Sequence, residues 1–221
     1  MARILILGAG AMSTAFSVPC LDRKHKVVIV GTHLENIFID KLKKNNHYHP
    51  NLKLHISKKT NIKKYNHLSI ELKKRPDLIV LGVSSKGINW SIEQLKNSFF
   101  DKKLPPILML TKGLSVFENK YELLANKLKR LLMDEKFQSI NISAVGGPCL
   151  ASGLASKVHS SVIFANKNLK TVKWLKDILS TNYYHPSISK DISGVETCAA
   201  IKNIFSMAIG AYKGLSNDTI N

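Results

Sequence analysis

Short apolar runs alternate with longer segments of helical spacing along most of the chain. Each run ends at glycine or at small polar residues, which is typical of strands buried on both faces of a parallel sheet. Because no internal repeat interrupts the alternation, the pattern predicts an α/β fold with a doubly wound parallel sheet. The expected strands are 4–7, 26–30, 77–83, 107–110, 140–145 and 161–165, and the expected helices are 11–22, 88–100 and 169–180.

Two expected helices have special features. Pro19 should kink or shorten the helix over 11–22, because proline lacks the N–H that a helix interior uses. A further helix is expected from Ser115, since Ser115 and Glu118 have the spacing of a capping box. A helix starting there would place four apolar side chains on one face: Tyr121, Leu124, Leu128 and Leu131.

The first strand is followed at once by a glycine turn, GAG at 8–10. Gly8 would allow the tight turn and Gly10 a close approach of the backbone to a phosphate, while the helix from Ala11 offers unpaired N–H groups. Ser13 replaces the third glycine of the usual pattern but is still small. A strand, a glycine turn and a helix in this order are typical of a Rossmann dinucleotide-binding unit. An ordinary strand-to-helix turn is the alternative.

The end of the second strand bears on which dinucleotide would bind. Gly31, Thr32 and His33 follow that strand, and none of them is acidic. An NAD-specific unit usually has an acidic residue there, which accepts a hydrogen bond from the ribose 2′-hydroxyl. The pattern therefore predicts that NADP or NAD is accepted, with NADPH slightly favoured, and that Thr32 or His33 lies at the adenosine ribose. Glu35 is interpreted as an acidic residue in the first turn of the next helix.

Composition adds a strong positive charge: 33 Lys and Arg against 15 Asp and Glu give a formal net charge of +18. Such a balance suits either nucleic-acid binding or an enzyme that handles anionic ligands. The lysines are scattered over expected helices and loops, without an interleaved platform of aromatic residues. The pattern therefore favours anionic small-molecule ligands, and no nucleic-acid partner is expected.

Cysteine and histidine positions do not predict a metal site. Cys20, Cys149 and Cys198 lie far apart, which indicates reduced thiols rather than a disulfide framework or a zinc site. His47 and His49 could suggest metal binding, but no third ligand clusters nearby, so 45–62 is interpreted as a solvated loop before a short strand. With no signal peptide or bilayer-spanning run recognised, a cytoplasmic protein without membrane insertion is expected.

The segment from Asp191 onward is apolar on almost every face at helical period. Such a helix is expected to be buried. Its polar side chains project within one arc, and they are Glu196, Lys202, Asn203 and Ser206. A buried cation and amide need partners, so this arc predicts either an internal salt bridge to an acid or a substrate site.

Six motifs occur in order across nearly the whole chain. They are GAGAMSTAF at the start, VVIVGTHLENI, LGVSSKG, LTKG around Lys112, GGPCLASGLA at 146–155 and GVETCAAIKNIFSMAIGA at 194–211. In their order and spacing the chain resembles the NAD(P)-dependent glycerol-3-phosphate dehydrogenase family. The resemblance implies interconversion of dihydroxyacetone phosphate and sn-glycerol 3-phosphate, in support of phospholipid synthesis. Ser13 and Cys149 depart from the family pattern, which usually has glycine and often has serine at these positions.

The resemblance also implies roles at the cofactor. The pyrophosphate would lie at the start of the first helix, and the adenosine end at the residues after the second strand. The implied cofactor-binding residues are Gly8, Gly10, Ala11, Met12, Thr32, His33, Lys112 and Ala151.

At the substrate, the resemblance implies contacts from Lys112, Gly147, Cys149 and Lys202. Lys202 would be the catalytic lysine, assisted by Lys112 and Asn203. Hydride transfer to a carbonyl carbon leaves negative charge on the carbonyl oxygen, and a lysine ammonium can stabilise that charge and donate the proton. Burial lowers the pKa of a lysine, which makes such a transfer feasible near neutral pH.

Members of this family continue with an all-helical domain. The resemblance therefore implies a Rossmann domain over 1–190 and, over 191–221, the first helix of a helical substrate domain that is cut short. The rest of a longer chain or a partner copy would cover that apolar helix, and a homodimer is expected. Two alternatives to the dehydrogenase of a small phosphorylated substrate stay open. One is an NAD(P)H-binding module with little or no catalysis, and the other is a β-hydroxyacid-type dehydrogenase of the same architecture.

Overall fold

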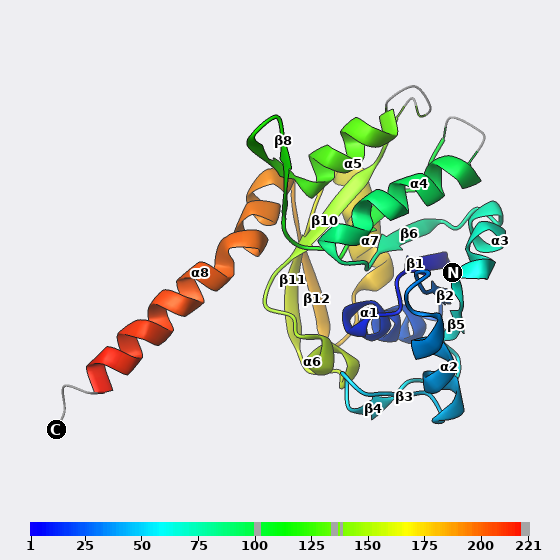
Figure 1. The fold of residues 1–221 in the computed structure, drawn as a ribbon, viewed down its shortest axis with the longest axis horizontal. Coiled ribbons are helices and arrows are strands. Elements are labelled where there is room, and N and C mark those ends of the chain that lie inside the picture. Colours follow the sequence, from blue (N-terminus) through cyan, green and yellow to red (C-terminus); the bar gives the residue numbers. More distant parts are fainter. Residues whose placement is uncertain (100–102, 134–136, 138, 218–221) are drawn as a thin grey trace.

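An eight-stranded sheet forms the centre of the protein in a computed structural model, which describes residues 1–99, 103–133, 137 and 139–217 (Figure 1). Its strand order is β12-β11-β10-β7-β6-β1-β2-β5. The strands are β1 (Arg3–Leu7), β2 (Lys26–Val30), β5 (Asn61–Lys63), β6 (Leu78–Leu81), β7 (Ile107–Met109), β10 (Ile142–Gly146), β11 (Ser160–Ala165) and β12 (Tyr184–Ser189). Six neighbouring strands of this order pair in parallel, namely β10, β7, β6, β1, β2 and β5. The chain passes from β1 through β2 to β5 and then returns to β6 on the other side of β1. The order in which strands are added therefore reverses between β1 and β6, which is the switch point of the sheet.

Helices cover both faces of this sheet. They are α1 (Ala11–Asp22), α2 (Asn36–Lys44), α3 (Leu68–Lys73), α4 (Ile88–Ser98), α5 (Leu124–Met133), α6 (Ala151–Ala155), α7 (Leu169–Leu179) and α8 (Ile192–Asn217). Ile4 and Ile6 of β1 enter one core with α1 and α7, whereas Leu5 and Leu7 enter the opposite core with α3, α4 and α5. Burial on both faces explains why the strands read as continuous apolar runs. The predicted α/β, doubly wound class is confirmed.

The sheet is mixed rather than wholly parallel, which corrects the prediction at β11, and β12 was not among the expected strands. β11 runs antiparallel to β10, and β12 runs parallel to β11. A parallel connection must carry the chain back along the whole preceding strand, usually through a helix of similar length. The five residues of α6 span only about 7.5 Å, against about 16 Å for a five-residue strand. The chain therefore turns and runs back along β10.

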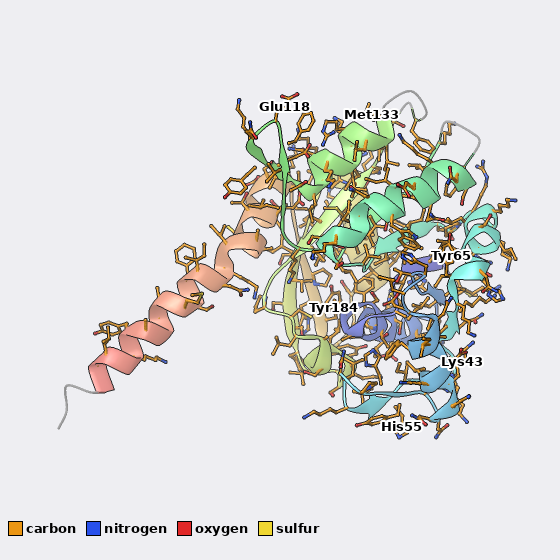
Figure 2. All side chains as sticks on the ribbon, viewed as in Figure 1. Lys43, His55, Tyr65, Glu118, Met133 and Tyr184 are labelled. Carbon is orange, nitrogen blue, oxygen red and sulfur yellow. The ribbon has the colours of Figure 1, made fainter. Side chains whose placement is uncertain are left out.

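A β-hairpin replaces the start of the helix that was expected from Ser115. β8 (Leu114–Phe117) pairs with β9 (Lys120–Leu123), and α5 begins only at Leu124. Glu118 and Asn119 at the turn have φ of 50° and 58°, as a two-residue type I′ hairpin requires, and Figure 2 shows Glu118 at the tip. The capping-box interpretation was wrong, because the side chains of 114–123 alternate between the two faces of a ribbon.

The histidine-rich segment is more ordered than the solvated loop expected there. β3 (Tyr48–His49) and β4 (Leu54–His55) form a second hairpin, followed by the expected short strand β5. His49 is completely buried, and its ring lies 5.1 Å from that of Phe38 between centroids. Across the described chain there is no group of three or more His, Cys, Asp or Glu side chains that could hold a metal ion. All three cysteines are free.

Two expected helices keep their position but change in detail. α1 continues through the buried Pro19 to Asp22 and is not shortened, since packing of the ring in the core offsets one lost backbone hydrogen bond. The helix expected over 88–100 is observed as α4 and ends at Ser98; Phe100 lies outside the described residues.

The long helix α8 forms where it was expected, but most of it is exposed rather than buried. Its first turns pack on the sheet, and over 202–215 it projects away from the body with its side chains exposed (Figure 2). Large apolar side chains are exposed along it: Ile204, Phe205, Met207, Ile209, Tyr212 and Leu215. The expectation of burial failed because no other part of the described chain extends far enough to cover the helix. None of the described helices is both long and apolar enough to cross a membrane.

Candidate active site

The glycine turn forms an open cradle at the carboxyl end of β1. Gly8 has a φ of 96°, which side chains disfavour, and its N–H donates to the carbonyl of Val30 at 2.8 Å. Gly10 is the N-cap of α1, and within the described chain no side chain caps this helix end. A Cβ built on Gly10 would meet no atom within 4 Å. The free space and the amides of the first turn, at Ala11 and Met12, fit the phosphates of a dinucleotide.

Ser13, the departure from the glycine pattern, fits against the end of β6. Its side chain is fully buried and its Oγ donates to the carbonyl of Gly82 at 3.0 Å. A Cβ built on Gly82 would lie 1.9 Å from that Oγ. The sequence therefore uses a serine on α1 and a glycine after β6 where the usual pattern needs a glycine on the helix. Gly82 was missed by the sequence analysis, although it follows a buried strand directly.

We expect Gly82→Ala to destabilise the protein by about 1–3 kcal/mol, the usual cost of overpacking a core. The two atoms nearest to the added methyl group both belong to the Ser13 side chain. The double variant Ser13→Gly with Gly82→Ala should therefore recover most of that loss. Urea unfolding of the wild type, both single variants and the double variant would measure the coupling. Additive losses in the double variant would contradict this account of the contact.

Glu35 lies at the turn rather than inside the next helix, which corrects its interpretation as a first-turn acid. It is the N-cap of α2, and its carboxylate faces back towards the glycine turn. The carboxylate oxygens accept from the N–H of Ala9 at 3.0 and 3.1 Å and from the N–H of Thr32 at 2.7 Å. An acid thus lies at the end of β2 after all. Thr32 beside it is half-buried and His33 is exposed.

Lys112 follows β7 and lies between the start of α1 and the start of α8. The hydroxyl of Thr111 donates to the carbonyl of Val83 at 2.7 Å and fixes the preceding backbone. Lys112 lines a cavity of about 20 Å³ together with Met12 and Cys149. It also lines a second cavity of about 10 Å³ with Glu196. The fold therefore brings together predicted residues from three distant motifs.

Charge interactions extend this group to Lys202. Partial burial lowers the pKa of Lys112, and the ammonium of Lys202 lowers it further, so the two cations share one region. Burial raises the pKa of the Cys149 thiol, against opposing contributions from Ser160 and Lys112. Lys202 and Asn203 themselves are exposed on α8. No ion pair of the described residues involves Lys202, so the internal salt bridge considered for it is not formed.

Gly147 and Ala151 lie at the same end of the sheet. Gly147 has a φ of 124°, and a Cβ there would lie 2.8 Å from the carbonyl oxygen of Ser161. Its own carbonyl accepts from the N–H of Cys149 at 3.0 Å. Ala151 begins α6, which packs against α1. Gly8, Lys112 and Gly147 thus follow the carboxyl ends of the parallel strands β1, β7 and β10, where ligands bind in open α/β sheets.

Glu196 lines the smaller cavity together with Lys112, and no separate role was predicted for it from the sequence. Its buried carboxylate accepts from the N–H of Ala125 at 3.2 and 3.3 Å, and this joins α8 to the first turn of α5. Burial raises the pKa of Glu196 to about 7, against the backbone donors of Ala125 and Leu124. An acidic residue on an otherwise apolar helix was the only signal in the sequence that Glu196 needs a partner. The partner could not be identified from local pattern, because Ala125 lies 71 residues away.

Comparison with known proteins decides the family. A model of the N-terminal part of NAD-dependent glycerol-3-phosphate dehydrogenase matches residues 3–172. The chain belongs to this family. NAD or NADP is accordingly its cofactor, in line with the open cradle at Gly10. The resemblance that the six motifs indicated is confirmed.

Relatives in this family are similar over nearly the whole chain. It is 28% identical over 218 residues to an NADP(+)-dependent glycerol-3-phosphate dehydrogenase from Archaeoglobus fulgidus, and 27% identical over 216 residues to a glycerol-3-phosphate dehydrogenase [NAD(P)+] from Mesoplasma florum. These alignments cover 96% and 95% of this chain and 60% of each relative. The crystal structure of the Coxiella burnetii enzyme superposes with a TM-score of 0.78 at 26% identity, covering 97% of this chain and 62% of that one. The chain thus spans about 60% of the length of its curated relatives.

Proposed function

We propose that the protein reduces dihydroxyacetone phosphate to sn-glycerol 3-phosphate with NADPH or NADH and so supplies glycerophospholipid synthesis. The observation that carries the proposal is the pair of cations: Lys112 lies at the carboxyl edge of the sheet, where it lines a cavity with Met12, and Lys202 on α8 interacts with it electrostatically. A dianionic phosphorylated ketone needs one positive charge for its phosphate and another for its carbonyl oxygen. The named relatives are dehydrogenases of glycerol 3-phosphate.

The residues around the turn would hold the dinucleotide. The amides of Ala11 and Met12 would bind the pyrophosphate at the positive end of the α1 dipole. Gly8 and Gly10 would keep side chains out of its way, and Ala151 would lie against the cofactor. When bound, the reduced dinucleotide supplies the hydride.

Lys112 would bind the substrate phosphate, next to Cys149 and the backbone of Gly147. Lys202 would hold its ammonium at the carbonyl oxygen, stabilise the negative charge that develops there and donate the proton. Asn203, beside it on α8, would help to orient the substrate by donating a hydrogen bond from its side-chain amide. The ammonium of Lys202 lowers the pKa of Lys112, which fits two cations that act on one dianionic substrate.

Three further aspects belong to this proposal. Residues 1–190 would act as the dinucleotide-binding domain, and 191–221 would begin a helical substrate domain. The exposed apolar side of α8 would be covered by the rest of a longer chain or by a second copy of it. A homodimer is proposed, and the enzyme would work in the cytoplasm. A sedimentation measurement tests the association, because a monomer at micromolar concentration would contradict the homodimer.

Oxidation of NADPH and NADH on addition of substrate tests the function. We expect turnover with dihydroxyacetone phosphate and none with unphosphorylated 2-oxo or 3-oxo acids, because those lack the dianion that Lys112 would bind. Dinucleotide binding without turnover on any substrate would instead support a cofactor-binding module. Preference for an oxo acid would support a β-hydroxyacid-type dehydrogenase.

A further inference from the structure

Glu35 places a fixed negative charge at the ends of β1 and β2. Its two oxygens accept from the backbone N–H groups of Ala9 and Thr32, at 2.7–3.1 Å. These donors belong to the two loops between which the ribose of a bound dinucleotide would lie. The two hydrogen-bonded amides fix the position of the carboxylate between these loops.

Glu35 lies where α2 packs closely against the end of β2. A Cβ built on Gly31 would lie 2.5 Å from Cδ1 of Ile39 and 3.2 Å from Cβ of Glu35. The start of α2 is therefore pressed against the end of β2, with the carboxylate directed at the turn. A ligand that carried a second negative charge here would meet the carboxylate of Glu35.

Three aromatic rings gather beside this position from separate parts of the chain. His33 follows β2, Tyr65 lies in a short 3₁₀ helix after β5, and Trp90 is on α4. Their ring centroids are 6.0–6.2 Å apart in all three pairs. His33 is exposed, and Tyr65 and Trp90 are half-buried. A flat purine attached to a ribose at Glu35 would find a stacking surface there.

The neighbouring lysines are already engaged. Lys63 pairs with Glu71 at 2.9 Å, and Lys64 pairs with Asp40 at 2.7 Å. The segment that carries Tyr65 therefore brings paired cations to the aromatic rings. For a phosphate on the ribose 2′ position, repulsion by Glu35 would therefore outweigh attraction by Lys63 and Lys64.

We propose that Glu35 makes this protein selective for NAD(H) over NADP(H), with the adenine bound against His33, Tyr65 and Trp90. The inference rests on the proposed function only in that a dinucleotide occupies the glycine turn. The carboxylate accepts from the 2′-hydroxyl of NADH and repels the 2′-phosphate of NADPH. This reverses the slight preference for NADPH expected when Glu35 was interpreted as a helix residue.

Equilibrium binding of NADH and NADPH to the full chain tests the proposal. We expect NADH to bind at least about tenfold more tightly at low salt, and the ratio to shrink between about 0.05 M and about 0.5 M NaCl as the repulsion is screened. Glu35→Gln, which keeps the shape but removes the charge, should bring the two affinities within about threefold. Asp177→Asn removes one negative charge from an exposed position of α7 and should leave the ratio unchanged.

The adenosine half can be examined by itself. Of the two tryptophans, Trp174 can be replaced by phenylalanine, so that Trp90 alone reports. AMP should then quench its fluorescence, and adenosine 2′,5′-bisphosphate should do so only at higher concentration. Equal or tighter binding of NADPH by the wild type would overturn the inference while leaving the proposed function intact. Failure of both dinucleotides to bind would overturn both. The ratio of NADH to NADPH affinity and its salt dependence are measured on the wild type. The inference can therefore be contradicted even if Glu35→Gln folds poorly.

Discussion

Replacement of Lys202 by alanine is expected to lower the rate of dihydroxyacetone phosphate reduction by about 10³-fold or more. The reaction would lose both charge stabilisation and proton donation with the ammonium group. Dinucleotide affinity should stay within about twofold of the wild type, because the glycine turn lies on other elements. The measurement is steady-state NADPH and NADH oxidation beside equilibrium dinucleotide binding. A rate close to that of the wild type would remove Lys202 from the reaction.

Lys213→Ala is the matched control, since Lys213 is also an exposed lysine of α8. It should leave the rate unchanged. A second readout does not depend on turnover: the pKa of Lys112 should rise in Lys202→Ala, because the ammonium that lowers it is gone. Titration of the Lys112 side chain by NMR would show this. An unchanged Lys112 pKa would mean that the two cations do not share a site.

Replacement of Glu71 by alanine is expected to cost about 3–5 kcal/mol of stability at pH 7, the usual loss when one partner of a buried ionic cluster is removed. The Glu71 side chain is only 1% exposed and contacts Arg3, Lys63 and Lys74. Without the carboxylate, three cations would repel each other beside β1 and β5. Thermal or urea unfolding measures the loss. Asp40→Asn, which removes a partner of Lys64 at the surface, is the control and should cost less than about 1 kcal/mol.

The same cluster predicts how stability depends on pH. Burial alone would raise the pKa of Glu71, but hydrogen bonds from Lys74, Lys63 and Arg3 outweigh it and lower the pKa from 4.5 to about 2. The folded state thus holds the proton less tightly than the unfolded chain. The contribution of Glu71 is therefore complete above about pH 5 and is lost as the pH falls towards 2. In Glu71→Gln this part of the acid dependence should disappear, and an unaltered acid profile would contradict the assignment.

Local pattern was enough to predict much of the fold. The central parallel strands β1, β2, β6 and β7 are buried on both faces, so each one appears as an apolar run that needs no partner to be recognised. The glycine turn and the motif around Lys112 are equally local, and the structure places both at the carboxyl edge of the sheet. The hairpin at 114–123 was missed because its turn, Glu118 and Asn119, has no glycine, while Ser115 and Glu118 have capping spacing by coincidence.

What the sequence determined by itself is most of the buried strands of the sheet, the turn at Gly8 and Gly10, and the family. The strands and the turn depend on residues that are close along the chain, and the family depends on six motifs that are each local. The tertiary structure alone decided that Glu35 faces Ala9, that Ser13 fits against Gly82, and that α8 leaves the body uncovered. Those contacts join residues far apart in sequence. Their formation depends on strand order and on the lengths of the connections, which no local pattern of apolar and polar residues encodes.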